Sequence, residues 1–186
     1  MRIGLISDTH IPSMGPEPPA QVVKAFEGVD VILHAGDINI PSCIEWLERI
    51  APVHASSSFF ATAVEAAPRV SQPVIVELEG HTIGLIHKLE LMGLMEDVYP
   101  GFIDKEYLPS HSIRADLEGV FGKPVDIVVF GYTHEALIET HDGILFVNPG
   151  STSMVKQVMK LGHVALLEFT PHGPEAKIID LASLRK

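Results

Sequence analysis

Four short apolar runs in this chain each lead into an acidic or histidine residue. The runs, with the polar residues that follow them, are 2–6 with Asp8 and His10, 29–35 with Asp37, 82–86 with His87, and 127–130 with His134. Runs of this length, rich in Ile, Leu and Val, predict buried β-strands. In open α/β sheets, ligands bind outside the carboxyl ends of the strands. The pattern therefore predicts one site, assembled at four strand ends from distant parts of the sequence.

The first of these segments predicts a metal ligand pair. Asp8 and His10 directly follow the run at 2–6, and in extended backbone the side chains of residues i and i+2 lie on the same side. Carboxylate and imidazole groups that converge on one point suit a divalent metal. The alternative is that Asp8 caps the following turn and His10 is an ordinary loop residue, but this alternative does not explain why the pattern recurs.

Composition favours one folded domain over residues 1–186. The chain has 186 residues, of which 46% are hydrophobic, and this is enough to bury a sizeable core. Its formal net charge of −11 disfavours nucleic acid and anionic membranes as partners. No segment has the length of a membrane span, and a single cysteine excludes an internal disulfide, so we expect a cytoplasmic protein.

Several polar residues in apolar surroundings have simpler explanations than catalysis. Cys43 lies among the apolar residues of an expected helix, which favours a packed thiol over a nucleophile. His34, His54 and His81 lie on or beside expected strands, and we interpret them as structural.

The order of the expected elements favours a mixed architecture. Strands alternate with helices, expected at 20–27 and at 42–50, in the first part of the chain, and this alternation predicts a largely parallel sheet. The capping-box pattern that begins at Ser42 predicts the start of the second helix. Further helical segments are expected at 62–67 and 115–121, and hairpins at 74–86, 136–147 and 164–179. Residues 88–124 form a long excursion after His87, either as local core or as a cover for the site.

With these pieces in order, the chain resembles the calcineurin-like metallophosphoesterase superfamily, in particular its small bacterial and archaeal phosphodiesterase branch. The matching segments are Asp8-Thr9-His10, Gly36-Asp37, Val53-His54-Ala55, His87, Gly131-Tyr132-Thr133-His134 and Asn148-Pro149-Gly150-Ser151. The resemblance implies an α/β (α+β) fold in which two mixed β-sheets pack face to face with helices outside.

The resemblance also implies a metal centre. Members of that family use two metals, about 3.5–4 Å apart, to activate water for attack on phosphorus. Mapped by motif, the first metal site would use Asp8, His10, Asp37 and His134, with Asp37 as the bridge to the second metal.

The second metal site departs from the family pattern. Phe59 stands where the family places an asparagine ligand, Tyr132 replaces the first histidine of the Gly-His-x-His element, and Leu89 replaces the second histidine of the His-Gly-His element. Phenylalanine cannot coordinate a metal, and a neutral tyrosine is a poor ligand. Because only Asp37 and His87 remain there, we expect one tightly held divalent metal per chain, with Mn, Fe, Zn and Ni all compatible with the ligands.

Two functions follow from these observations. The first is a metal-dependent phosphoesterase that hydrolyses a small phosphate-ester substrate at a centre with a degenerate second site. The second is a protein that keeps the fold as a binding or scaffold module, as the small retromer subunit of eukaryotes does. The sequence leaves the substrate, the metal and the oligomeric state open.

Overall fold

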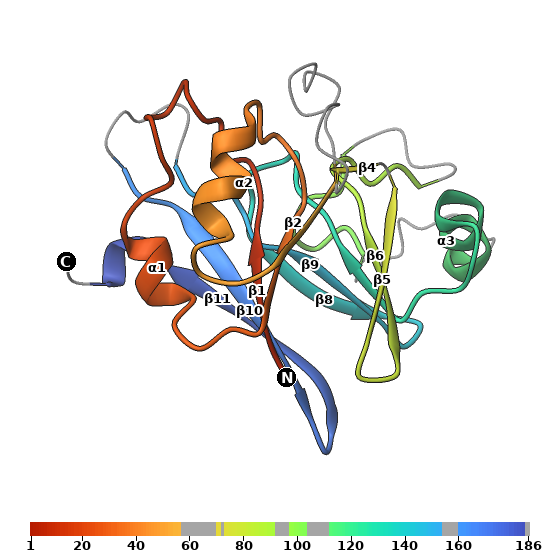
Figure 1. Cartoon of the computed structure of the whole chain (residues 1–186). Coiled ribbons are helices and arrows are strands. Elements are labelled where there is room, and N and C mark those ends of the chain that lie inside the picture. Colours follow the sequence, from red (N-terminus) through yellow and green to blue (C-terminus); the bar gives the residue numbers. More distant parts are fainter. Residues whose placement is uncertain (57–69, 72, 92–96, 104–111, 154–159, 185–186) are drawn as a thin grey trace.

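Two β-sheets form the centre of the molecule (Figure 1). The computed structural model describes residues 1–56, 70–71, 73–91, 97–103, 112–153 and 160–184. The six-stranded sheet has the spatial order β11 (Gly173–Asp180), β10 (His163–Thr170), β1 (Arg2–Ile6), β2 (Val31–His34), β3 (Val53–Ser56) and β4 (Val70–Ser71). The five-stranded sheet has the order β5 (Val74–Leu78), β6 (His81–Leu85), β7 (Ile127–Val129), β9 (Ile144–Asn148) and β8 (Leu137–His141).

Both sheets are mixed. In the larger one, β1, β2, β3 and β4 are parallel, while β10 pairs antiparallel with both β1 and β11. In the smaller one, β7 lies parallel between β6 and β9, and β5 and β8 add antiparallel edges through the two expected hairpins. This arrangement confirms the predicted fold class, an α/β (α+β) sandwich of two mixed sheets with flanking helices.

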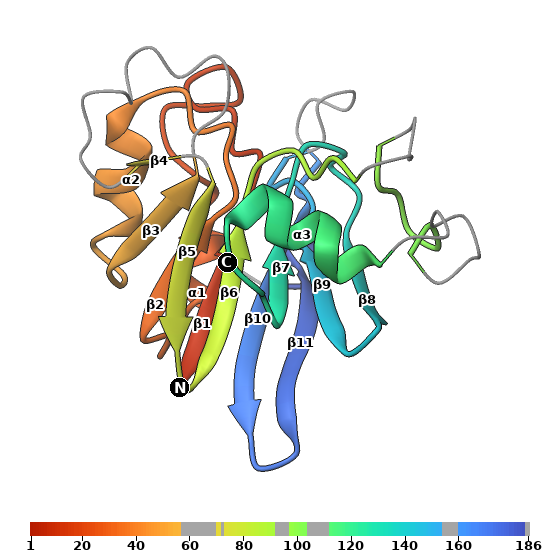
Figure 2. The ribbon, with the colours of Figure 1, turned by 90° about the vertical axis from the view of Figure 1, so that its right-hand side faces the viewer.

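Helices cover the outer face of each sheet. The helices α1 (Gln21–Ala25) and α2 (Pro41–Leu47) pack on the larger sheet, and α3 (Ile113–Phe121) lies across the smaller one (Figure 2). A short 3-10 helix, Leu181–Ser183, ends the described chain. Within the part of the chain that the structure describes, no helix is long and apolar enough to cross a membrane.

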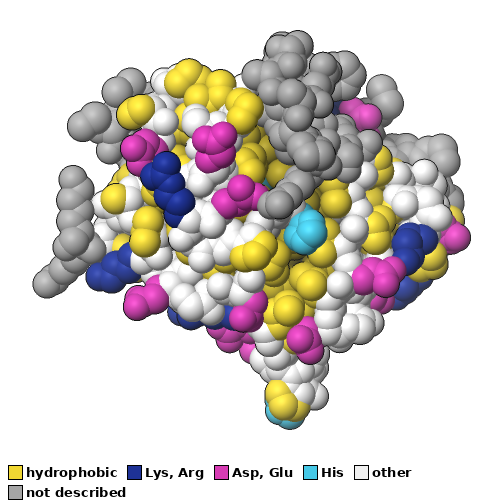
Figure 3. Space-filling view, in the orientation of Figure 1, with side chains coloured by type: hydrophobic (Ala, Val, Ile, Leu, Met, Phe, Trp, Pro, Cys, Tyr) yellow, Lys and Arg dark blue, Asp and Glu magenta, His cyan; other side chains and the backbone are white. Residues whose placement is uncertain are grey.

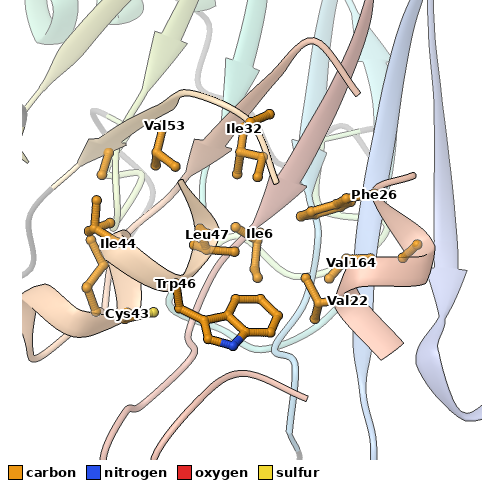
Figure 4. Packing of buried hydrophobic residues seen from close by; sticks show 14 of the residues in the cluster. Ile6, Val22, Phe26, Ile32, Cys43, Ile44, Trp46, Leu47, Val53 and Val164 are labelled. Atoms are coloured by element: carbon orange, nitrogen blue, oxygen red, sulfur yellow. The ribbon is translucent and has the colours of Figure 1, made fainter. Parts of the chain in front are cut away.

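The alternation of side chains along β1 shows how the layers are built. Leu5 faces the second sheet and belongs to the apolar layer between the sheets, whereas Ile6 faces the helices. Figure 4 shows this helix-side layer, in which Phe26 follows α1 and Trp46 lies on α2, both packed over the strands. A third layer, between α3 and the smaller sheet, contains Phe146.

The excursion after His87 contributes to this third layer. Leu91, Val98 and Ile103 are buried in the same cluster as Ile113 and Phe121 of α3. The described parts of residues 88–124 therefore supply local core, which was one of the two alternatives.

The capping box at Ser42 is a wrong prediction. The helix α2 begins one residue earlier, at Pro41, and its N-cap, Ile40, makes no side-chain capping bond. Proline is suited to the first helical position because its missing N–H would have no helical partner there. The helical segment expected at 62–67 lies outside the described residues.

The surface carries few basic groups. On the face shown in Figure 3, Lys and Arg side chains lie among Asp and Glu side chains, without a broad basic area among the described residues. This distribution agrees with the net charge of −11.

Truncation of Leu33 tests the layer between the sheets. Leu33 lies on β2 and is completely buried. We expect Leu33→Ala to lower the free energy of unfolding by about 2–5 kcal/mol, because it removes buried methyl groups and leaves a cavity. Urea unfolding measures the change. Val23→Ala is the control, since Val23 is 49% exposed on α1, and a cost similar to that of Leu33→Ala would contradict the layer assignment.

Candidate metal centre

The carboxyl ends of β1, β2, β6 and β7 meet at one place. The amide of Asp8 donates to the carbonyl of Gly36, and the amide of Gly131 donates to the carbonyl of His87, which joins the loops within each sheet. The two sheets are joined by the amide of Tyr132, which donates to Asp8 Oδ2 at 3.1 Å. The four strand ends therefore form one cluster.

All five residues named from the sequence lie in this cluster. The distance from His10 Nε2 to Asp37 Oδ2 is 3.0 Å. Asp8 Oδ1 lies 3.4 Å from His134 Nε2 and 4.0 Å from His87 Nε2.

Two groups of these side chains could hold a metal ion. One contains Asp8, His10 and His134, the other contains Asp8, Asp37 and His87, and within each group the ligand atoms lie within 4.8 Å of one another. Asp8 is common to both groups, whereas the resemblance gave the shared position to Asp37.

The carboxylate of Asp8 provides the test of whether a cation fits. Asp8 is completely buried. Its Oδ2 accepts hydrogen bonds from Ser7 Oγ, at 2.5 Å, and from the Tyr132 amide. Its Oδ1 is also buried but accepts no hydrogen bond from the described residues. A buried carboxylate oxygen without a donor is costly unless a positive charge compensates it. The oxygen faces imidazole nitrogens, so this set of ligands fits a divalent cation.

The ring of His87 is oriented for coordination. Its Nδ1 lies 2.9 Å from the carbonyl oxygen of Ala35. Because a carbonyl only accepts, Nδ1 must be the donor, and in the neutral ring the lone pair is then on Nε2, the atom nearest Asp8. Such a backbone partner is the usual support of a metal-binding histidine.

His10 and Asp37 alter each other's protonation. Burial opposes the charged form of both groups, but their mutual hydrogen bond and opposite charges outweigh this penalty. The pKa of His10 is therefore raised above its usual value, and the pKa of Asp37 is lowered below its own. Both side chains remain partly accessible to solvent.

Four of the five residues have a left-handed backbone. The φ angles are +51° at Asp8, +51° at His10, +53° at Asp37 and +62° at His134. The strand β1 already ends at Ile6, so the expected alternation of an extended backbone does not bring Asp8 and His10 together. Their side chains converge because the chain turns sharply after the strand. Such conformations cost about 1–3 kcal/mol each and persist where surrounding contacts impose them.

Two glycines allow the strand ends to approach one another. A Cβ atom on Gly36 would lie 2.6 Å from the ring of His87, and one on Gly131 would lie 1.9 Å from Ser7 Oγ and 2.6 Å from Asp8 Oδ2. Neither distance is compatible with a side chain, so glycine is required at both positions.

Tyr132 lies at the open side of the centre. Its side chain is 43% exposed, and its ring meets the ring of His87 edge-on at a centroid distance of 5.6 Å. Lys88 Nζ lies over the tyrosine ring, 4.8 Å from its centroid. The same ammonium group pairs with Glu90 at 3.1 Å and with Asp97 at 3.3 Å. Phe59, the other departure in the second metal site, lies outside the described residues.

Sequence reasoning assigned no role to the residues that hold these loops. Asn148 Nδ2 donates to the carbonyl of Gly131 and to Thr133 Oγ1, both at 3.0 Å. Ser151 Oγ donates to the carbonyl of Asp8 at 2.8 Å. The sequence feature that could have indicated these two residues is the Asn-Pro-Gly-Ser segment at 148–151, which matches the family pattern.

Comparison with known proteins assigns the chain to a family. The model of the calcineurin-like phosphoesterase superfamily domain matches residues 1–171. The chain belongs to this superfamily. Its members are metal-dependent and act on phosphate esters. Two archaeal proteins, each described as a probable metallophosphoesterase, are similar to the chain. The one from Methanothermobacter thermautotrophicus is 32% identical over 154 residues, which are 83% of this chain and 78% of that protein. The one from Methanocaldococcus jannaschii is 30% identical over 167 residues, which are 87% and 75%.

Solved structures with the same fold include a Vps29 and a protein described as an archaeal phosphodiesterase. Wild-type Vps29 from Entamoeba histolytica, solved with zinc, matches 97% of this chain and 99% of its own with a TM-score of 0.64. A structure described as a novel archaeal phosphodiesterase matches 96% of this chain and 100% of its own with a TM-score of 0.63. Each is 18% identical to this chain, so these likenesses show the fold.

A pair of glycine substitutions tests the close approach at the centre. Gly131→Ala should lower the free energy of unfolding by about 1–3 kcal/mol, because the new methyl group overlaps Ser7 and Asp8. Gly119→Ala is the matched change on α3, where a Cβ atom meets nothing within 4 Å, and it should raise stability by up to about 1 kcal/mol. Urea unfolding of both variants measures the difference, and equal effects would show that the loops at the centre are not tightly packed.

Proposed function

We propose that this chain is a metal-dependent phosphoesterase whose divalent cation is held by Asp8, His10, Asp37 and His134. The main support is the buried Asp8 Oδ1, which has no hydrogen-bond donor among the described residues and faces imidazole nitrogens. A scaffold has no need for such a costly arrangement. His87 is a weaker, additional ligand.

The chain's own residues explain how a cation would be bound and which oxygen of Asp8 would coordinate it. A bound divalent cation polarises a phosphoryl oxygen and lowers the pKa of water. Asp8 and Asp37 would supply the negative charge, and His10 and His134 would supply nitrogen ligands, since imidazole binds metals in its neutral form. The hydrogen bonds of Ser7 and of the Tyr132 amide hold Asp8 Oδ2, which leaves Oδ1 as its coordinating atom.

We further propose that one metal is held tightly and that the second site is degenerate. Tyr132 replaces a histidine ligand of the family, and Phe59 replaces an asparagine ligand. Loss of a single outer-shell partner can already weaken a metal site about 10–100-fold, so loss of inner ligands should weaken the second site further. Manganese, iron, zinc and nickel all suit the remaining nitrogen and oxygen ligands.

Charge favours a phosphodiester as the substrate. One divalent cation with two carboxylates has no net charge, and the whole chain carries −11. A phosphodiester has one negative charge, whereas a phosphomonoester at neutral pH has nearly two. The negative charge of the chain therefore repels a phosphodiester less than a phosphomonoester. We therefore propose a small phosphodiester as the substrate class and a phosphomonoester as the poorer alternative.

A binding or scaffold protein is the second candidate. It is favoured by the exposed Tyr132 in place of a ligand and by the likeness of the fold to Vps29. A hydrolase should turn over substrate and need Asp37 to do so, whereas a scaffold should show no turnover that depends on Asp37.

Substitution of Asp37 tests the hydrolase function. With Mn²⁺, we expect wild-type protein to hydrolyse an aryl phosphodiester. EDTA should abolish this turnover, and Asp37→Asn should reduce it by at least about 100-fold, since an inner ligand is lost. Asp30→Asn is the matched control, because Asp30 is exposed and its carboxylate, among the described contacts, accepts a hydrogen bond only from the Arg2 amide. A rate unchanged in Asp37→Asn, or no turnover with any divalent metal, would favour the scaffold.

Restoring a histidine at position 132 tests the degenerate second site. The backbone there has φ of +74°, which histidine tolerates better than most residues. We expect Tyr132→His to bind a second equivalent of Mn²⁺ where wild type binds one, measured as the metal-to-protein ratio after dialysis against Mn²⁺. Tyr132→Phe, which adds no ligand, is the control. Two equivalents in wild type would contradict a degenerate site.

A further inference from the structure

His34 is a completely buried histidine beside the candidate metal centre. It is the last residue of β2, three positions before Asp37. Its Nδ1 lies 3.1 Å from the amide nitrogen of Gly36, and its Nε2 lies 3.2 Å from Thr9 Oγ1. The ring therefore touches the loop after β1 and the loop after β2 at the same time.

The hydrogen bonds around His34 have only one consistent direction. The Gly36 amide must donate, so Nδ1 is unprotonated. Burial lowers the pKa of His34 to about 3, so the ring is neutral at neutral pH and carries its proton on Nε2. That proton is donated to Thr9 Oγ1, and the Thr9 hydroxyl in turn donates to the carbonyl of Asp37 at 3.2 Å. The Thr9 oxygen can also accept from Cys43 Sγ, 3.5 Å away.

This chain of hydrogen bonds joins the backbones of the proposed ligands. Thr9 lies between Asp8 and His10, whose amides donate to the carbonyls of Gly36 and Asp37 at 3.0 and 3.2 Å. The three proposed ligands on these two loops, Asp8, His10 and Asp37, have positive φ angles. A left-handed conformation at three non-glycine residues needs contacts that impose it, and the His34–Thr9 chain closes the space between the two loops.

We propose that His34 is a positioning residue of the metal centre, acting through Thr9 to hold Asp8, His10 and Asp37 in their left-handed conformations. This inference rests on the proposed function. It replaces the purely structural role that its sequence position suggests, because both of its nitrogens bond to the loops that bear the proposed ligands and not to the packed layer around it.

Substitutions that remove single hydrogen bonds test the inference. Thr9→Val removes the hydroxyl and keeps its shape, while Thr9→Ser keeps the hydroxyl. His34→Asn keeps an acceptor near Nδ1 for the Gly36 amide but does not reach Thr9. We expect Thr9→Val and His34→Asn to weaken Mn²⁺ binding, measured by calorimetry, about 10–100-fold, as for other partners that orient metal ligands. Thr9→Ser should bind Mn²⁺ nearly as wild type does.

Ile32→Ala separates positioning from general stability. Ile32 lies two residues before His34 on β2 and is also completely buried. We expect Ile32→Ala to lower the urea midpoint while its Mn²⁺ affinity stays at the wild-type value. Unchanged affinity in Thr9→Val and His34→Asn, or an equal loss of affinity in Ile32→Ala, would overturn the inference.

A measurement without metal separates this inference from the proposed function. In EDTA, the amides of Asp8 and His10 should exchange with solvent at least about tenfold faster in Thr9→Val and His34→Asn than in wild type, since local opening is governed by such contacts. The Leu5 amide should keep its protection, and ¹⁵N NMR should show His34 protonated on Nε2. If the wild-type protein does not bind Mn²⁺, the proposed function is wrong. The exchange rates would still test the role of His34 in that case. Unchanged exchange in both variants would overturn it.

Discussion

The contact between Asp8 and the loop after β7 joins the two sheets at the point where their strands end. Asp8 follows β1 of the larger sheet, yet its carboxylate accepts the amide of Tyr132, which follows β7 of the smaller sheet. The backbone carbonyl of Asp8 accepts from Ser151. The approach needs Gly131, because any side chain there would overlap Ser7 and Asp8. A buried carboxylate therefore lies where the two sheets meet, with His134 Nε2 and His87 Nε2 at 3.4 and 4.0 Å from its Oδ1.

Much of the fold and most of the centre could be predicted from the sequence. Apolar runs such as residues 2–6 and 127–130 predict strands because their side chains are buried on both faces. The polar residues after them converge because neighbouring strands in each sheet are parallel. The left-handed backbones of Asp8 and Asp37 could not be predicted, since they are imposed by contacts between loops distant in sequence. For the same reason the sequence does not predict the hydrogen bonds of His34 and Asn148 to these loops.

Tyr132, which stands where the family pattern has a histidine, changes the surroundings of His87. The Tyr132 amide donates to Asp8 Oδ2, and this backbone contact does not depend on the side chain at position 132. The ring turns its edge to His87 and one face to Lys88, whose charge is shared with Glu90 and Asp97. Strand alternation predicts that Lys88 points away from His87, but β6 ends at Leu85 and the alternation no longer applies. The second site is thus bordered by an aromatic ring and a paired ammonium group.

The candidate metal centre is a locally costly arrangement. It contains four left-handed residues, at about 1–3 kcal/mol each, and a buried carboxylate oxygen that no described donor satisfies. A binding module would gain stability by replacing Asp8 with an apolar or amide side chain. The left-handed conformations of Asp8, His10, Asp37 and His134 are imposed by the surrounding loop contacts, and they direct the four side chains toward one another. Under the proposed function, this local cost is preorganisation, in which the fold positions the ligands before a cation binds.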